Sequence, residues 1–178
     1  MQGLAGAETE RLRLERWDHA AHASGLARIN ADPEVTRYVG GGVVPRAASD
    51  EMSRRLETHW DVYGHGLWAA IVKESGAMIG FVGVSHPLWW PEMIERVEAG
   101  WRLARDAWGF GYATEGAREA VRIGCELLGL AEIVSFVHPE NTRSLAVCER
   151  LGMVEETEVA HPTRDERIRI MRLPCSSS

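Results

Sequence analysis

Hydrophobic and polar positions change their period along the early part of the chain. Residues 11–16 alternate polar and apolar side chains, which is the period of a half-exposed strand. Asp18 is a suitable N-cap for a helix that reaches about Asn30, and Asp32-Pro33-Glu34 predicts a second short helix with Pro33 at its first position. The glycine run at 40–42 predicts a break after these helices.

A longer amphipathic helix and a hairpin are predicted next. The helix is expected over residues 46–63 and ends at Gly64. Its apolar positions recur at helical spacing: Met52, Leu56, Trp60 and Tyr63. Two apolar runs follow, at 67–73 and 78–85, and the turn residues between them at 74–77 are typical of a hairpin.

The second half of the chain alternates between strand and helix patterns. In chain order we expect a loop at 86–93, a strand at 96–104, a helix at 112–128, a strand at 132–137, a helix at 141–151, and strands at 153–159 and 166–173. Gly129 and Gly152 stand where the two helices end. The order β-α-α-β-β-β-α-β-α-β-β predicts a mixed α/β layout with one βαβ-like passage.

Length and charge narrow the class of protein. The chain has 178 residues, which fits a single domain over 1–178 with loose ends. Its formal net charge of −6 argues against nucleic acid or an anionic membrane surface as a partner. No apolar stretch approaches the length of a membrane-spanning helix, and the first residues lack the pattern of a signal peptide.

The cysteines give an odd count. Cys125, Cys148 and Cys175 form no CxxC pair and no cluster with histidine. This pattern predicts neither a disulfide framework nor a zinc site, and we expect no metal. Free thiols are typical of a reducing compartment, so we expect a cytoplasmic location.

A glycine turn between a strand and a helix is the most informative segment. Gly109 and Gly111 allow a tight turn, and the helix that follows offers free N–H groups to a phosphate or pyrophosphate. A dinucleotide fingerprint would need a third glycine at position 114, where Thr114 stands, and a Walker loop would need a Gly-Lys pair, which the chain lacks. A purely structural turn stays open as an alternative.

Four segments around this turn carry a resemblance to a known family. Residues 98–103 (EAGWRL) and 108–115 (WGFGYATE) resemble the cofactor motif of the GNAT superfamily of N-acetyltransferases. Residues 138–144 (HPENTRS) and 149–153 (ERLGM) resemble a second signature of the branch that contains the ribosomal-protein N-terminal acetyltransferases. The resemblance covers about residues 9–173. It implies an α/β (α+β) fold, with a mixed, mostly antiparallel sheet of about seven strands, splayed between the fourth and fifth, and about four flanking helices.

The resemblance also implies an acetyl-CoA site. The pyrophosphate would lie on the glycine turn and the pantetheine arm between the two splayed strands. The residues expected to contact the cofactor are Trp101, Arg102, Leu103, Trp108, Gly109, Phe110, Gly111, Tyr112, Ala113, Thr114, Asn141, Arg143 and Ser144. Asn141 is also a suitable N-cap for its helix. The family usually has Arg or Gln at the position of Asp106, where the side chain contacts a cofactor phosphate. Arg105, the neighbouring residue, is the candidate to make that contact here.

Acetyl transfer to an amine needs a base, and the leaving thiolate needs a proton. By resemblance Glu98 is the first candidate base, with membership of a cross-strand ion pair as the alternative; Glu95 and His86 are in reserve. Cys148 takes the position of a tyrosine that many superfamily members use as the acid. A helical cysteine is more often a small buried apolar residue, and solvent is an alternative proton source.

The acceptor side is the least defined part of the sequence. His86, Trp89 and Trp90 lie in the loop that the resemblance places at the acceptor entrance, although packing against the core explains the tryptophans equally well. We expect an acyltransferase that moves an acetyl group to a primary amine in a ternary complex. The acceptor is a protein or peptide N-terminus or a small amine, an aminoglycoside-like molecule included. The alternative is a non-catalytic acyl-CoA-binding module. We expect a monomer or a homodimer.

Overall fold

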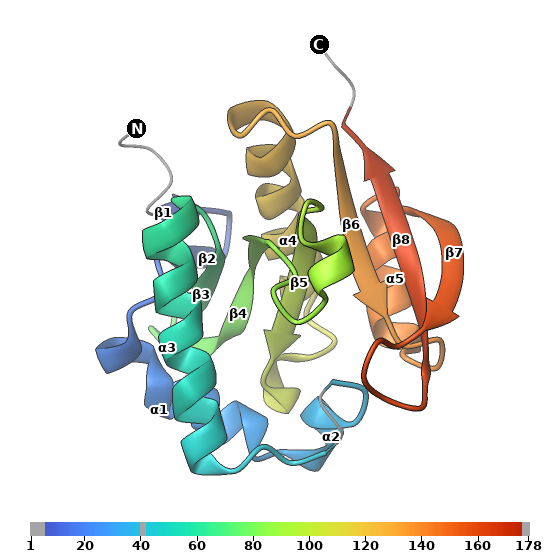
Figure 1. Ribbon diagram of the computed structural model, residues 1–178. Helices are drawn as coiled ribbons and strands as arrows, with labels where there is room; N and C mark the ends of the chain where they lie inside the picture. The colour runs from blue at the N-terminus through green and yellow to red at the C-terminus, as the bar shows by residue number, and fades with distance from the viewer. Residues whose placement is uncertain (1–5, 40–41, 176–178) are drawn as a thin grey trace.

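A single mixed sheet organises the molecule. The computed structural model describes residues 6–39 and 42–175 and has an eight-stranded sheet in the order β1-β2-β3-β4-β5-β6-β8-β7 (Figure 1). The strands are β1 (Gly6–Glu8), β2 (Leu12–Glu15), β3 (Leu67–Val72), β4 (Met78–Ser85), β5 (Glu98–Leu103), β6 (Glu132–Val137), β7 (Val154–Ala160) and β8 (Arg167–Pro174). Neighbouring strands are antiparallel except β5 and β6, which are parallel. The mixed, mostly antiparallel fold predicted from the sequence is confirmed.

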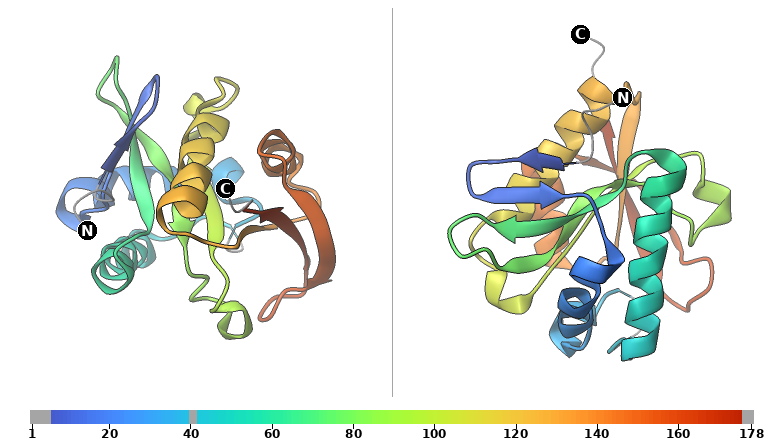
Figure 2. Two further views of the ribbon diagram at one scale, coloured as in Figure 1. Left: turned by 90° about the horizontal axis from the view of Figure 1, so that it is seen from above. Right: turned by 90° about the vertical axis from the view of Figure 1, so that its left-hand side faces the viewer.

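Helices cover both faces of this sheet (Figure 2). They are α1 (His19–Asn30), α2 (Pro33–Thr36), α3 (Arg46–Tyr63), α4 (Tyr112–Arg122) and α5 (Thr142–Arg150). Adjacent strand residues point to opposite faces, and β4 shows which helices lie on each. Phe81 packs edge-on against Trp17 beside α1, whereas Val82 lies directly under Gly116 of α4. The α1/α3 face and the α4 face are therefore separate sides of the central strands.

Local sequence signals explain most element ends. The Asp18 side chain accepts a hydrogen bond from the N–H of Ala21 and caps α1, as predicted. Pro33 begins α2, and Gly64 ends α3 with a φ of 71°. The helix expected at 112–128 is α4 followed by a π-helical turn at Ile123–Leu127. Gly40, Gly41 and the extreme termini lie outside the described residues.

Strand β1 is the element that the pattern missed. Its three residues are too few to show an alternation, and it exists because it pairs with β2, for example Ala7 with Leu14. This strand raises the count from the expected seven to eight.

Strands β5 and β6 touch at one end and separate toward the other. Within the described residues their register contains the single pair Glu98–Val134. The N–H of Val134 donates to the carbonyl of Val97 at 2.9 Å, and the Ser135 hydroxyl donates to the carbonyl of Ala99 at 2.9 Å. Beyond Ala99 the strands diverge, which is the predicted splay.

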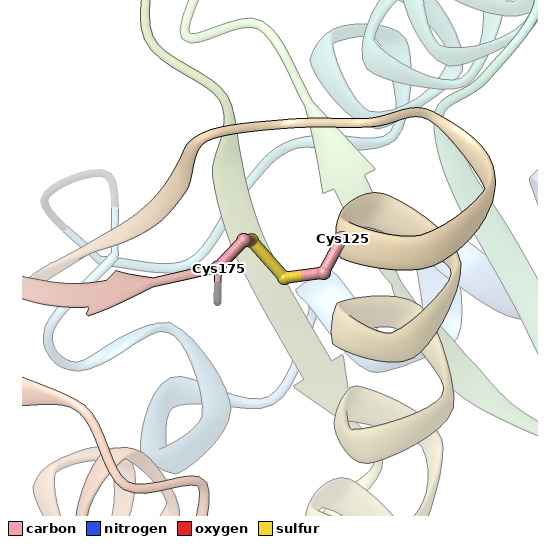
Figure 3. The surroundings of a disulfide bond; sticks show 2 residues. All are labelled: Cys125 and Cys175. Atoms are coloured by element: carbon pink, nitrogen blue, oxygen red, sulfur yellow. A yellow bond between two sulfur atoms is a disulfide. The ribbon is translucent and has the colours of Figure 1, made fainter. Parts of the chain in front are cut away.

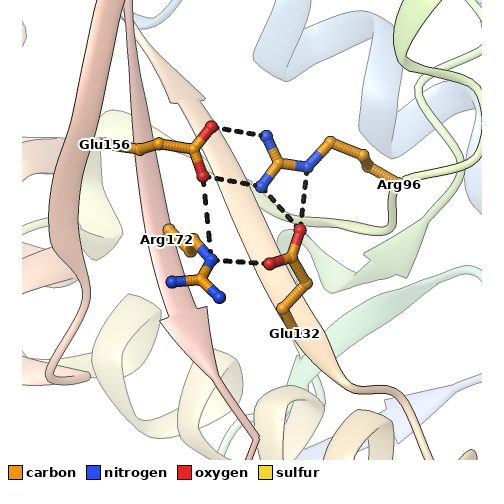
Figure 4. A network of polar contacts seen from close by, with 4 residues as sticks. All are labelled: Arg96, Glu132, Glu156 and Arg172. Carbon is orange, nitrogen blue, oxygen red and sulfur yellow. Dashed lines mark hydrogen bonds and ion pairs between the residues drawn. The ribbon is translucent and has the colours of Figure 1, made fainter.

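An ion-pair network joins four elements at the closed end of this splay (Figure 4). Arg96, just before β5, contacts Glu132 of β6 at 2.6 Å and Glu156 of β7 at 2.8 Å. Arg172 of β8 contacts Glu132 at 2.6 Å. A hydrogen bond from Arg172 lowers the pKa of Glu132, and one from Arg96 lowers the pKa of Glu156. The network fastens the start of β5 to β6, so the two strands can separate only at their other end.

A disulfide joins the end of the helix after α4 to the end of β8 (Figure 3). Cys125 and Cys175 are bonded, with Cα atoms 5.3 Å apart and a separation of 50 positions in sequence. The prediction that the cysteines form no disulfide was therefore wrong. The N–H of Cys175 donates to the carbonyl of Ala131, which holds the end of β8 beside the α4–β6 connection. Cysteine spacing carries no information about this tertiary neighbour.

Among the described helices, none has the length and apolar character needed to cross a membrane.

Candidate active site

The glycine turn after β5 presents uncapped backbone N–H groups. Gly109 and Gly111 both have a φ of 83°, a left-handed conformation that favours glycine. Gly111 is the N-cap of α4, and no side chain caps this end. The N–H groups of Tyr112, Ala113 and Thr114 thus precede the first intrahelical bond, which Glu115 donates to Gly111. Free donors and the positive end of the helix dipole make this an anion site.

Arg11 fixes the glycine turn to the start of β2. Its guanidinium donates to the carbonyl of Phe110 at 2.9 Å, contacts Glu115 at 2.6 Å and lies over the Tyr112 ring. Thr9 donates a further hydrogen bond to Glu115 at 2.6 Å. Burial opposes ionisation of Glu115, but the bonds from Thr9 and Arg11 outweigh it and lower its pKa. The turn is held in shape before any ligand arrives.

A cleft of about 930 Å³ opens at this turn. Its walls come from β5, the glycine turn, α4, α5 and the segment that contains α2. The predicted cofactor residues all line it: Trp101, Arg102, Leu103, Trp108, Gly109, Phe110, Gly111, Tyr112, Ala113, Thr114, Asn141, Arg143 and Ser144. Residues far apart in sequence are thus brought to one cavity.

Side chains at the start of α5 stabilise the fold and also have hydrogen-bond donors that can reach a ligand in the cleft. The Asn141 Oδ1 accepts from the N–H of Ser144 at 3.2 Å, which is the predicted cap. In the described part of the chain the Asn141 Nδ2 has no hydrogen-bond partner, so it can donate into the cleft. Arg143 lies over the Trp108 ring, 4.5 Å from its centroid, and the Trp108 indole donates to the carbonyl of Leu103 at 3.0 Å.

Backbone groups of β5 face the gap between the splayed strands. The N–H of Ala104 donates to Ile79 of β4, so by antiparallel alternation the N–H and C=O of Arg102 and Gly100 also point to β4. The N–H and C=O of Trp101 therefore point away from β4, toward β6. The register gives Trp101 no β6 partner within the described residues. A ligand in the splay can pair with these groups as an added strand does.

Glu98 lies at the closed end of the splay and outside the walls of the cleft. Burial raises its pKa to about 7, against a hydrogen bond from the Trp89 indole that lowers it. Within the described residues Glu98 forms no ion pair, so the structure does not have the cross-strand ion pair that was the alternative role for this residue. The distance along β5 from Glu98 to Trp101 is about 10 Å at the usual rise per residue. A group that reacts beside the Trp101 backbone therefore needs a water to pass a proton to Glu98.

Cys148 is enclosed in the core. Its exposed fraction is 0%, and burial raises the pKa of its thiol to about 12. It lies on the buried side of α5 and does not line the cleft. This environment is that of the small buried apolar residue considered in the sequence.

The three expected acceptor-side residues have different roles. Trp90 is only 7% exposed and packs against Val134, Ile168 and Ile170 in a small core of its own. Trp89 is 41% exposed, stacks on His161 and reaches Glu98. His86 bonds the carbonyl of Ile94 through its ring and the His59 ring through its backbone N–H. None of the three lines the cleft.

Comparison with known proteins decides the family. Residues 11–154 match the acetyltransferase (GNAT) domain. This chain belongs to the GNAT family. It is 30% identical over 199 residues to the FsC-acetyl coenzyme A-N(2)-transacetylase of Aspergillus fumigatus, covering 92% of this chain and 78% of that one. The chain is therefore identified as an N-acetyltransferase, with the acceptor unspecified.

Solved structures of GNAT and other acetyltransferases have the same fold. An acetyltransferase from Agrobacterium tumefaciens superposes with a TM-score of 0.81 at 28% identity, over 97% of this chain and 96% of that chain. The ribosomal-protein-S5-alanine acetyltransferase of Vibrio fischeri gives a TM-score of 0.77 at 16% identity, over 96% of each chain. The second likeness concerns the fold alone.

The departure from the GNAT motif lies away from the cleft. Asp106 and Arg105 belong to a short 3-10 turn at Arg105–Ala107 and border a separate hollow beside α1 and α2. Arg105 is thus not placed to substitute for the missing motif residue.

The cleft also contains cations that lie outside the sequence motifs. Arg118 is one turn of α4 after Thr114, and Arg150 is two turns of α5 after Arg143. Helical spacing from the predicted residues would have placed both on the cleft side. Tyr38, after α2, also lines the cleft and lies 5.0 Å from the His138 ring. No sequence signal pointed to Tyr38.

Proposed function

We propose that the cleft binds acetyl-CoA and that the chain transfers the acetyl group to a primary amine in a ternary complex. The observation that carries this proposal is the gathering of every expected cofactor residue around one cleft at the open end of the splay. The uncapped N-terminus of α4, with the cleft cations Arg118, Arg143 and Arg150, suits the phosphates. The Asn141 Nδ2 and the free backbone of Trp101 suit the amides of a pantetheine arm.

When bound, acetyl-CoA supplies a thioester whose acyl carbon the amine attacks, so that a C–N bond forms as the C–S bond breaks. The Trp101 N–H would be the group that donates to the thioester oxygen and stabilises the negative charge that develops there. Glu98 accepts the proton that the amine loses, through a water. Solvent protonates the leaving thiolate, because Cys148 is enclosed and its thiol holds its proton too tightly.

The acceptor is proposed only as a class. The Aspergillus relative is named as an N(2)-transacetylase, and the Vibrio structure as a ribosomal-protein-S5-alanine acetyltransferase. A primary amine on a small molecule or on a peptide N-terminus is consistent with both. The α1/α3 face of β5, which carries Glu98, is the side from which we expect it to arrive. The cytoplasmic location expected from free thiols loses that support, because Cys125 and Cys175 are bonded.

Titration calorimetry with acetyl-CoA tests the cofactor site. Wild-type protein should bind it, and Gly111→Val should weaken binding at least tenfold, since a β-branched residue resists a φ of 83° and crowds Arg11. Gly76→Val is the matched control, because Gly76 has a φ of 69° in the β3–β4 turn, away from the cleft. Absence of binding to wild type at millimolar acetyl-CoA would refute the proposal. If Gly111→Val binds acetyl-CoA as tightly as Gly76→Val does, the turn is only structural.

A further inference from the structure

Arg102 is a half-buried cation that has no carboxylate partner among the described residues. Its Nη1 donates to the Asn30 Oδ1 at 2.7 Å, and its guanidinium lies over the Phe81 ring, 5.4 Å from the centroid. Its Nε is shielded from solvent and has no hydrogen-bond partner. Burial lowers the pKa of Arg102 to about 10, so the side chain is still a cation at neutral pH.

No described residue compensates this charge with an ion pair. Within the described residues Arg102 forms no ion pair, while many other arginines do, such as Arg11 with Glu115 and Arg96 with Glu132. The residues outside the described ranges contain no Asp or Glu. Removing a cation from water without an opposite charge is costly, so an Arg in this position is most stable when an anion reaches it from outside.

Two helices hold the guanidinium in a fixed direction. Asn30, at the end of α1, accepts from Arg102 and donates to the Ser49 hydroxyl of α3 at 3.0 Å. Asn30 and Ser49 are both fully buried. The chain Ser49–Asn30–Arg102 therefore orients the charge in advance, which reduces the cost of binding an anion.

Arg102 also lies on the acceptor side of β5. Strand alternation places it on the same face as Glu98, with Gly100 between them. A Cβ at Gly100 would meet only the Leu67 side chain, at 3.7 Å, so this face is open between the two charged residues. Arg102 itself lines the cleft. An acceptor bound here would have the proposed base on one side and a cation on the other.

We propose that Arg102 binds a carboxylate of the acceptor, so that the preferred acceptors are primary amines that also carry a carboxylate. This inference rests on the proposed acetyl transfer. Arg102 is then a specificity-determining residue: its guanidinium pairs with the carboxylate while the amine reaches the acyl carbon. Asn30 is a positioning residue that acts through Arg102.

Matched acceptor pairs test the inference. Each pair is an amino acid or short peptide with a free carboxylate and the same molecule as its carboxamide. Wild type should have the higher kcat/KM with the carboxylate member of each pair. Arg102→Gln should remove this preference by lowering kcat/KM for the carboxylate member about tenfold to hundredfold, as expected for a charge-assisted bond. The effect should fall mainly on the KM for the acceptor.

Two further variants separate recognition from structure. Asn30→Asp places a carboxylate beside the guanidinium without changing side-chain size, and should also abolish the preference. Arg102→Lys should restore part of it. Arg55→Gln is the control, since Arg55 is exposed on α3 and, among the residues that the structure describes, pairs only with Glu51.

The same ligand pairs, added to the CoA complex in a thermal unfolding assay, give a readout without turnover. Stabilisation by the carboxylate member in wild type but not in Arg102→Gln or Asn30→Asp would support the site even if no amine were acetylated. An equal response of wild type to both members of every pair would overturn the inference, whether or not acetyl transfer is found.

Discussion

The Trp89 indole N–H donates to the Glu98 Oε2 over 3.4 Å, and this bond links the loop after β4 to the first residue of β5. Burial and this hydrogen bond have opposite effects on the ionisation of the Glu98 carboxyl. Burial raises the pKa of Glu98 to about 7, while the Trp89 bond favours the carboxylate and lowers it. A carboxylate with such a pKa is half ionised near neutral pH, as a general base for amine deprotonation should be.

Replacing Glu98 by Gln should lower kcat/KM by roughly a hundredfold to ten-thousandfold, the range expected for loss of a general base. In wild type kcat/KM should decline as pH falls below about 7, because protonated Glu98 cannot accept a proton. This limb should be absent from the Glu98→Gln profile. Acetyl-CoA affinity, measured separately, should be unchanged; an unaltered pH profile would remove Glu98 from the mechanism.

Trp89→Phe should move the same limb of the pH profile to higher pH. Phenylalanine keeps a ring against His161 and Phe136 but cannot donate to Glu98, so the pKa of the carboxyl should rise. The limb is located from kcat/KM measured between pH 5 and 9. In the Glu98→Gln background the Trp89 change should produce no shift, and a shift there would show that another group titrates.

Acidification should destabilise the fold through His59. Its Nδ1 bonds the carbonyl of His65 at 2.9 Å and its Nε2 accepts from the N–H of His86 at 3.0 Å, an arrangement that only a neutral ring can make. Burial lowers its pKa from 6.5 to about 4, and the nearby His65 and His86 rings add to this effect. The unfolded chain takes up the proton first, so the contribution of His59 to stability is complete above pH 6.5 and is lost as pH falls toward 4. Glu98, whose pKa is raised in the folded chain, contributes the opposite slope over this range.

Urea unfolding at several pH values measures this loss, whose slope for one group is at most about 1.4 kcal/mol per pH unit. His59→Gln should reduce the slope between pH 6.5 and 4, even if it lowers stability throughout. Carboxylates with lowered pKa, such as Glu132, contribute only at lower pH, below about 4.5. An identical slope in the variant would exclude His59 as the source.

Reduction of the Cys125–Cys175 disulfide should lower the free energy of unfolding. With the cysteines 50 positions apart in sequence, the chain-entropy relation gives roughly 4 kcal/mol. Unfolding with and without dithiothreitol measures the change, and a Cys125→Ser/Cys175→Ser variant should be insensitive to the reductant. Equal stability of wild type in both conditions would mean that the bond is not formed in solution.

Features that depend on neighbouring residues in sequence could be predicted, whereas features that depend on tertiary contacts could not. Asp18, Pro33 and Gly64 set helix ends through local geometry, so the pattern located them. The glycine turn was predictable because Gly109 and Gly111 are needed for their left-handed backbone. The disulfide was not predictable, since it depends on β8 ending beside the α4–β6 connection. The uncompensated charge of Arg102 was equally hidden, because a lack of partners is visible only in three dimensions.

Part of the candidate site also depends on the tertiary arrangement. The expected cofactor residues are local to two motifs, and the structure gathers all of them. Trp89 and Trp90 are neighbours in sequence, yet one reaches Glu98 and the other is buried in a core. Their alternating environments follow from the loop's path over β6 and β8, which no pattern in residues 86–93 reveals.

The most direct test of acetyl transfer is a turnover measurement with wild-type protein, acetyl-CoA and a panel of primary amines that includes peptide N-termini, amino acids and aminoglycosides. Free thiol is followed continuously, and each amine is examined by mass spectrometry. The account predicts thiol release that depends on the amine and matches, mole for mole, the amine acetylated. Tight binding of CoA without acetylation of any amine in the panel would contradict it and indicate an acyl-CoA-binding module.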